Sequence, residues 1–139
     1  SFVPVRIKWP NDLMVAERKL AGFLPRIVSR GKMIKYARVG IGINVRNRVS
    51  NKAISLSQIF KKRNVSIPEW TAKILLSLEK VNSLMKDNQL LCRQAEELLL
   101  KGEFHEKETN KVWEIKGLNI DGSIILKRGL EIKCLYHWN

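Results

Sequence analysis

The segment over residues 35–45 constrains the fold of this chain more than any other. Its apolar side chains alternate with glycine or asparagine, which is the two-residue period of a β-strand. One face of the strand is therefore apolar, and the other carries Gly40, Gly42 and Asn44. Glycines two residues apart weaken a strand, and close approach by a ligand or another backbone is the usual reason for them. The pattern predicts a flat platform without side chains, with Asn44 at its end.

Three shorter strands are predicted ahead of this segment. Apolar and polar residues alternate over residues 2–9, and turn-forming residues at 10–12 then break the pattern. Residues 13–16 and 20–28 form the next two strands around a polar turn at 17–18. A short antiparallel meander is the simplest assembly of these strands.

Helices are predicted in the middle of the chain. A short helix is expected over residues 55–60, and a longer amphipathic helix begins near Pro68 with an apolar stripe that should pack into a core. A third helix over residues 89–100 should also turn one apolar face inward, with Gly102 as its stop. The stripe of the long helix is Trp70, Ile74, Leu78, Val81 and Met85, and the inward residues of the third helix are Leu91, Ala95, Leu98 and Leu99.

Short strands dominate the last part of the chain. They are predicted over residues 112–116, 123–127 and 130–136, with glycine-containing turns between them. This β unit is expected to be a small domain, so the chain divides into residues 1–102 and 103–139. The fold class that follows is α+β.

The chain carries 26 lysines and arginines against 13 acidic residues, a formal net charge of +13. Such an excess favours acidic partners, which include nucleic acid, phosphates and acidic protein surfaces. The basic residues lie in short groups such as Lys61-Lys62-Arg63, without the interleaved aromatic residues of a base-stacking surface. The alternative interpretation, that the chain is a nucleic-acid-binding fragment without catalysis, therefore rests on the net charge alone and stays open.

Several classes of protein are disfavoured by what the sequence lacks. No stretch approaches the roughly 18 apolar residues of a membrane span, and the N-terminal residues lack the order of a signal peptide, so we expect a cytoplasmic protein without a membrane partner. Cys92 and Cys134 lie far apart without further ligands, which favours reduced thiols over a zinc site or a disulfide framework. His105 and His137 are isolated, and generic catalytic signatures are absent.

Three segments nevertheless form a specific set. They read Lys8-Trp9-Pro10-Asn11-Asp12-Leu13, Arg18-Lys19-Leu20-Ala21-Gly22 and Val39-Gly40-Ile41-Gly42-Ile43-Asn44-Val45. In this order and spacing they resemble the biotin protein ligases, and the likeness extends through the helix after Pro68. The resemblance implies a mixed or antiparallel sheet backed by helices, related to lipoate ligases and class II aminoacyl-tRNA synthetases, followed by a small SH3-like β unit.

The resemblance also implies roles for individual residues. Lys19 would contact both the biotin carboxylate and the α-phosphate of ATP, where a fixed ammonium stabilises the negative charge that builds up during attack. Asp12 would share the catalytic role and contact Mg²⁺, a metal that prefers oxygen ligands. Asn44 would read the adenine edge with its amide. The implied biotin contacts are Lys19, Gly22, Leu24, Gly40 and Gly42, and the implied ATP or adenylate contacts are Lys8, Trp9, Asn11, Asp12 and Asn44.

The activity implied by the resemblance is ATP-dependent ligation of biotin, through biotinyl-5'-AMP, to a lysine of the biotin carboxyl carrier protein of acetyl-CoA carboxylase. ATP, Mg²⁺ and biotin are the implied cofactors and substrates, no nucleic acid is expected on this segment, and a homodimer is left open. The family's Gly-Arg-Gly-Arg-type loop, which clamps the adenylate, precedes the segment that begins at Lys8. We therefore expect that an upstream segment is required and that the isolated chain is weakly active or inactive. A lipoate ligase-like enzyme is the nearest enzymatic alternative.

Overall fold

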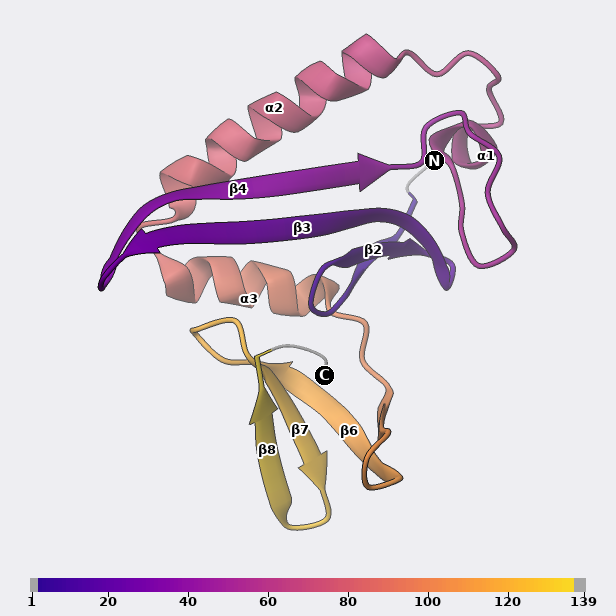
Figure 1. Cartoon of the computed structure of the whole chain (residues 1–139). Coiled ribbons are helices and arrows are strands. Elements are labelled where there is room, and N and C mark those ends of the chain that lie inside the picture. Colours follow the sequence, from indigo (N-terminus) through magenta and orange to yellow (C-terminus); the bar gives the residue numbers. More distant parts are fainter. Residues whose placement is uncertain (1–2, 137–139) are drawn as a thin grey trace. The chain divides into compact units, whose positions relative to one another are not determined.

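The structure is a computed structural model that describes residues 3–136. These residues form two four-stranded antiparallel sheets and three helices, which confirms the α+β class (Figure 1). The strands are β1 Val5–Lys8, β2 Asp12–Val15, β3 Arg18–Arg30, β4 Met33–Ile43, β5 Glu103–Glu106, β6 Lys111–Leu118, β7 Ile124–Arg128 and β8 Glu131–Leu135. The helices are α1 Leu56–Phe60, α2 Ile67–Leu84 and α3 Asn88–Leu98.

The chain divides into two compact units. The first, residues 1–67, holds the sheet β1-β2-β3-β4 and α1, and the second, residues 68–139, holds α2, α3 and the sheet β5-β6-β7-β8. The second sheet begins at Glu103, where the small β domain is predicted to start, but the division between the units lies at residue 67. The domain boundary at residue 103 and the SH3-like character of this sheet stay predictions.

The long hairpin of β3 and β4 dominates the first unit (Figure 1). The two strands pair from Ala21↔Ile43 out to Arg30↔Met33, and Gly31 turns the chain with a φ of 60°. The strand predicted over residues 35–45 therefore exists, although it begins and ends two residues earlier. The strands β1 to β4 all pair in the antiparallel direction. Among the described residues, parallel pairing is limited to one isolated bridge, Lys19↔Ala53. The sheet is thus antiparallel rather than mixed.

The short helix α1 is fixed to the inner end of this hairpin. Ser55 caps the helix in a capping box with Gln58, in which each residue's side chain accepts from the other's backbone N–H. Two backbone bonds, Leu56 N–H to the Asn44 carbonyl and Ser57 N–H to the Val45 carbonyl, both at 2.9 Å, bind α1 to the chain that leaves β4. The helix predicted over residues 55–60 is confirmed. The buried residues of this unit are Trp9, Met14, Val15, Leu20, Ala21, Ile54, Ser55, Leu56 and Val65.

Three predictions about the helices and the last sheet are wrong. No residue of α2 is buried, and Leu78, Val81 and Met85 of its predicted core stripe are exposed. Helix α3 ends at Leu98, because the backbone of Leu99 is already extended, so Gly102 is not its stop. Leu98 is exposed rather than turned inward. Strand β5 is missing from the predicted strands, because its residues Glu-Phe-His-Glu show no two-residue apolar alternation and include no β-branched residue. Among the described residues no helix is long and apolar enough to cross a membrane.

The second unit has a small core between α3 and its sheet. Ile124 and Leu126 of β7 are fully buried, and Trp113 of β6 is 5% exposed. The Glu96 carboxylate of α3 accepts a bond of 3.3 Å from the Leu118 N–H and lies where a side chain at Gly117 would stand. Cys92 and Cys134 are both free thiols, as predicted.

An ion pair joins the two edges of the second sheet. Glu106 of β5 binds the Lys133 ammonium of β8 and the Thr109 hydroxyl, and it accepts a bond of 3.3 Å from the Trp113 indole N–H. The pKa of Glu106 is lowered from 4.5 to about 2. The hydrogen bond from Lys133 is the largest cause, and that from Thr109 is the next. Lys133 also lies over the ring of Trp113, 5.6 Å from its centre.

We expect the second unit to lose stability in acid through Glu106. Its pKa is lowered in the folded state, so its contribution is complete above pH 4.5 and is lost as the pH falls through about 2. Thermal unfolding followed by tryptophan fluorescence should show this decline in the wild type and a smaller one in Glu106→Gln. Equal acid sensitivity of the two proteins would contradict the role of this carboxylate.

Candidate functional site

An open cavity of about 650 Å³ lies over β3 and β4 within the first unit. Its lining consists of Asn11, residues 19–24, residues 40–44 and Asn47. The three segments that stand out in the sequence are separate along the chain, and the antiparallel pairing of β2, β3 and β4 brings all three of them to this cavity.

The floor of the cavity has few side chains. Gly22 pairs directly with Gly42, and Leu24 pairs with Gly40, so these four residues lie on one face of the hairpin. A side chain added at Gly42 would meet no atom within 4 Å, whereas one at Gly40 would contact Leu24 at 3.6 Å. The platform predicted from the glycine alternation therefore exists, and open space lies above Gly42.

A β-bulge places Lys19 on this face. Side chains alternate along a strand, so residues 19 and 22 would ordinarily lie on opposite faces. The β2–β3 register runs from Leu13↔Ala21 to Met14↔Lys19, which leaves Leu20 without a partner on β2. The extra residue returns Lys19 to the face of Gly22, and bulges of this kind commonly redirect side chains beside active sites. No sequence signal predicts the bulge.

Lys19 and Asp12 form an ion pair across the two strands. The Lys19 ammonium lies 2.6 Å from a carboxylate oxygen of Asp12, and their side chains are 47% and 21% exposed. The pair lies directly over Gly22, where an added Cβ would stand 3.1 Å from the Lys19 nitrogen and 3.3 Å from the Asp12 oxygen. The glycine is therefore needed for the close approach of the pair to the strand.

Asn44 lies at the end of the platform and has a fixed amide. Its side-chain nitrogen donates to the Lys19 carbonyl at 3.3 Å, and its side-chain oxygen accepts from the Asn47 amide at 3.0 Å. Its backbone N–H donates to the Leu20 carbonyl at 3.0 Å. The second amide hydrogen and the second lone pair of Asn44 are left for a ligand. Asn47 is a cavity residue that the sequence did not single out, because it lies in a loop with no pattern of its own.

Asn11 also lines the cavity, whereas two other predicted residues do not. Asn11 binds Phe23 of β3 twice, through its side-chain amide to the Phe23 carbonyl and through its own carbonyl to the Phe23 N–H, both at 2.8 Å. Lys8 is exposed in β1, and Trp9 is 7% exposed and belongs to the core. Neither lines the cavity, and their contact with a nucleotide stays a prediction.

The cavity edge offers few oxygen ligands to Mg²⁺. Asp12 offers one carboxylate at the cavity edge, and no cluster of three or more His, Cys, Asp or Glu residues that could hold a metal occurs in the part of the chain that the structure describes. Mg²⁺ is commonly bound by one or two carboxylates together with substrate phosphates and water. Asp12 therefore fits a metal that arrives with a nucleotide rather than one held by the protein alone.

Comparison with known proteins shows the family. The model of the biotin/lipoate A/B protein ligase family matches residues 1–44. The bifunctional ligase/repressor BirA of Escherichia coli and that of Salmonella typhimurium are each 43% identical over 44 residues, which are 32% of this chain and 14% of each relative. The apo structure of biotin protein ligase from Aquifex aeolicus matches 97% of this chain with a TM-score of 0.79 and 25% identity. Residues 1–44 belong to the biotin/lipoate A/B protein ligase family.

The chain spans 64% of the length of the apo Aquifex structure. A second Aquifex structure, in complex with biotin and ATP, matches with a TM-score of 0.74 and 23% identity, and it is likewise covered in part, to 60%. The described residues thus share their fold with part of a protein whose structure was determined in complex with biotin and ATP. Roles for individual residues of this chain remain proposals.

A pair of alanine substitutions tests the geometry under Lys19 and Asp12. We expect Gly22→Ala to lower the free energy of unfolding by about 1 kcal/mol, because the added methyl group forces the ion pair away from the strand. Gly42→Ala should change it by less than about 0.5 kcal/mol, because its methyl group enters open space. Urea unfolding of the two variants measures the difference. Equal stability of the two would show that the pair does not lie on Gly22.

Proposed function

We propose that this chain carries part of the active site of a biotin protein ligase, which joins biotin to a carrier lysine at the expense of ATP. In the first step a biotin carboxylate oxygen attacks the α-phosphate of ATP, which forms biotinyl-5'-AMP and releases pyrophosphate. In the second step a lysine amine of the carrier attacks the acyl carbon, which forms an amide and releases AMP and a proton. The observation that carries the proposal is the Lys19–Asp12 pair at the edge of a cavity whose floor carries three glycines.

The cavity suits the reacting groups of the first step. A flat floor at Gly22, Gly40 and Gly42 leaves room for the fused rings of biotin, and Leu24 offers an apolar wall beside them. The Lys19 ammonium lies at the inner end of this floor, where it would bind the biotin carboxylate and the α-phosphate oxygens together. A preorganised cation stabilises the charge that develops there more effectively than mobile water does.

Asp12 and Asn44 would have separate roles toward the nucleotide. Asp12 holds the Lys19 ammonium in place and would contribute an oxygen ligand to Mg²⁺, which neutralises phosphate charge when it is bound. The Asn44 amide would accept from the amino group of adenine and donate to a ring nitrogen. Its bonds to Lys19 and Asn47 fix the orientation in which it does so.

The location and partners belong to the same proposal. We place the enzyme in the cytoplasm, with the biotin carboxyl carrier protein of acetyl-CoA carboxylase as its acceptor, and with a requirement for the family's adenylate-clamping loop. Adenylate binding comes before transfer and needs no acceptor protein, so binding is a more direct test of the site than activity.

Calorimetric titration with a non-hydrolysable biotinyl-adenylate analogue tests the proposal. We expect Lys19→Ala and Asn44→Ala each to weaken binding about tenfold or more, since a lost charge-assisted or amide hydrogen bond is worth roughly 1.5–3 kcal/mol. Gly42→Ala should also weaken it, because its methyl group occupies the floor.

Gly102→Ala is the matched control for this titration. An alanine there also meets no atom within 4 Å, but the position lies outside the cavity, so binding should be unchanged. A wild-type chain that does not bind the analogue, or cavity variants that bind it as the control does, would contradict the proposal. Tighter binding of a lipoyl-adenylate analogue would assign the site to the lipoate branch of the family instead.

A further inference from the structure

The net positive charge of the chain is confined to its first unit. Residues 1–67 hold 15 of the 26 lysines and arginines but only two acidic residues, Asp12 and Glu17. Residues 68–139 hold 11 basic and 11 acidic residues and are neutral. No acidic residue occurs between Glu17 and Glu69. A charge balance that differs this much between two units of similar size points to a local cause in the first unit rather than to a general excess of basic residues.

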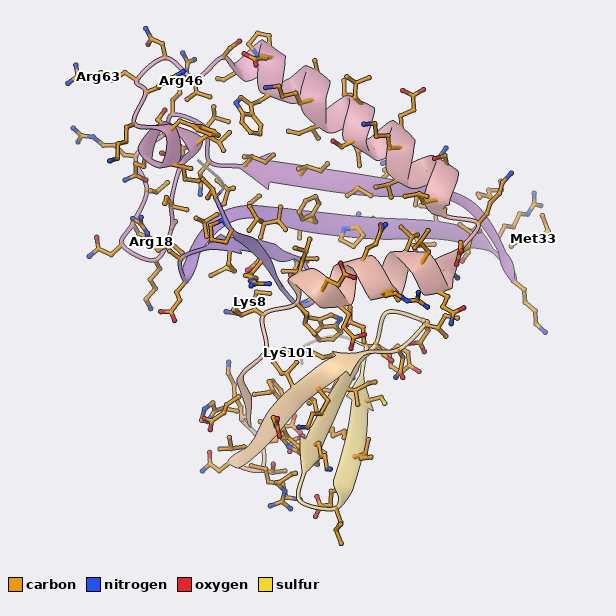
Figure 2. All side chains as sticks on the ribbon, turned by 180° about the vertical axis from the view of Figure 1, so that it is seen from behind. Lys8, Arg18, Met33, Arg46, Arg63 and Lys101 are labelled. Carbon is orange, nitrogen blue, oxygen red and sulfur yellow. The ribbon has the colours of Figure 1, made fainter. Side chains whose placement is uncertain are left out.

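Part of this charge gathers around α1. Six exposed basic residues lie in the loops on either side of the helix, and we call them the basic end. Arg18, Arg46 and Arg63 project at one end of the first unit, and the hairpin tip at Met33 is at the other (Figure 2). The basic end consists of Arg46, Arg48, Lys52, Lys61, Lys62 and Arg63.

Local hydrogen bonds hold the basic end together. The Ser57 N–H bond to the Val45 carbonyl places the start of α1 beside Arg46, and a helix of five residues rises only about 7 Å before it reaches Lys61. Lys52 is joined to the same region because its carbonyl accepts from the Lys19 N–H at 2.9 Å. Six like charges are thus concentrated on a short, hydrogen-bonded segment.

These charges are not balanced within the chain. Among the described residues, the ion pairs include none of the six side chains of the basic end. Asp12 is already paired with Lys19, so it does not neutralise them. A cluster of unpaired, exposed cations repels itself and attracts an acidic partner over about 8 Å at physiological ionic strength.

The basic end borders the cavity. Asn47, which lines the cavity and binds Asn44, lies between Arg46 and Arg48 in the sequence. A macromolecule that docks on the basic end would therefore lie at the rim of the cavity. In the proposed reaction, one macromolecule has to come to that place, which is the protein whose lysine receives biotin.

We propose that the basic end is the docking surface for an acidic face of the carrier domain, beside its acceptor lysine. This proposal rests on the proposed function. A nucleic-acid partner fits the surface less well, because Phe60 is the lone aromatic residue between Asn44 and Ile67 and stacking on single strands uses several. Helix α1, with five residues, is also too short to read a major groove in the manner of recognition helices.

Two triple charge reversals of equal size test the proposal. The first, Arg48→Glu, Lys62→Glu and Arg63→Glu, alters the basic end at exposed positions that do not line the cavity. The second, Arg30→Glu, Lys32→Glu and Lys35→Glu, alters the hairpin tip and is the matched control. Fluorescence anisotropy would measure binding of a labelled acidic carrier domain at low and high salt, with circular dichroism as the check on folding.

We expect the first triple variant to bind the carrier domain at least tenfold more weakly than the wild type and to lose most of the salt dependence. The control should change affinity less than threefold. Equal losses in the two variants, no carrier binding by the wild type, or tighter binding of an arbitrary DNA duplex than of the carrier would overturn the proposal.

Titration of the same proteins with the biotinyl-adenylate analogue separates the two levels of the account. Analogue binding should be unchanged in both triple variants. One outcome is that the wild type binds the analogue while the first triple variant binds the carrier domain as tightly as the wild type does. In that case the docking surface is wrong and the proposed function stands. If the wild type does not bind the analogue, the proposed function itself fails.

Discussion

The site depends on one backbone irregularity, the bulge at Leu20 in β3. Without it, Lys19 would lie on the face opposite Gly22, and its ammonium would have no route to Asp12 on β2. The Leu20 carbonyl also accepts the Asn44 N–H, so the bulged segment positions both Lys19 and Asn44 at the same end of the cavity. Strand β3 is therefore the element that every other part of the site contacts: β2 through Asp12, β4 through the glycine floor, and α1 through Asn44.

The cavity combines openness with a rigid frame. Its floor is open because glycines at paired positions leave no side chains above the strands, and its rim is rigid because Asn11, Asn44 and Lys19 are each held by backbone bonds. A site that is to bind a flat ring and an anionic linker needs both properties. The unbalanced cations at the rim add long-range attraction, which acts mainly on the rate and selectivity of association.

Much of the first unit could be predicted from the sequence, because its signals are local. The alternation around Gly40 and Gly42 predicted the platform, and the Ser55–Gln58 spacing belongs to a capping box, so β4 and α1 lie close to where we expected them. The resemblance named Lys19, Asp12 and Asn44, and the structure brings all three together at one cavity edge. What the sequence could not predict is the bulge, because the exact register of the β2–β3 hairpin depends on tertiary contacts that leave no mark in the sequence.

The errors in the second unit have the same origin. An amphipathic stripe such as that of α2 shows which residues could be buried, but not which element will cover them. Helix α3 ends before Gly102 because Leu99 is needed in the core, where it is 4% exposed, and this tertiary demand overrides the glycine signal. Strand β5 forms a hairpin with β6 and is further held by the Glu106–Lys133 pair, whose two residues lie 27 positions apart.

The central claim is that a biotinyl-adenylate lies on the glycine floor between Lys19 and Asn44. Backbone amide NMR of the labelled chain, recorded during titration with the non-hydrolysable analogue, tests it residue by residue. The account predicts the largest shifts at Gly22, Gly40, Gly42 and Asn44, with the amides of β5 to β8 nearly unchanged. Shifts centred on the second sheet, with the glycine amides unmoved, would contradict it.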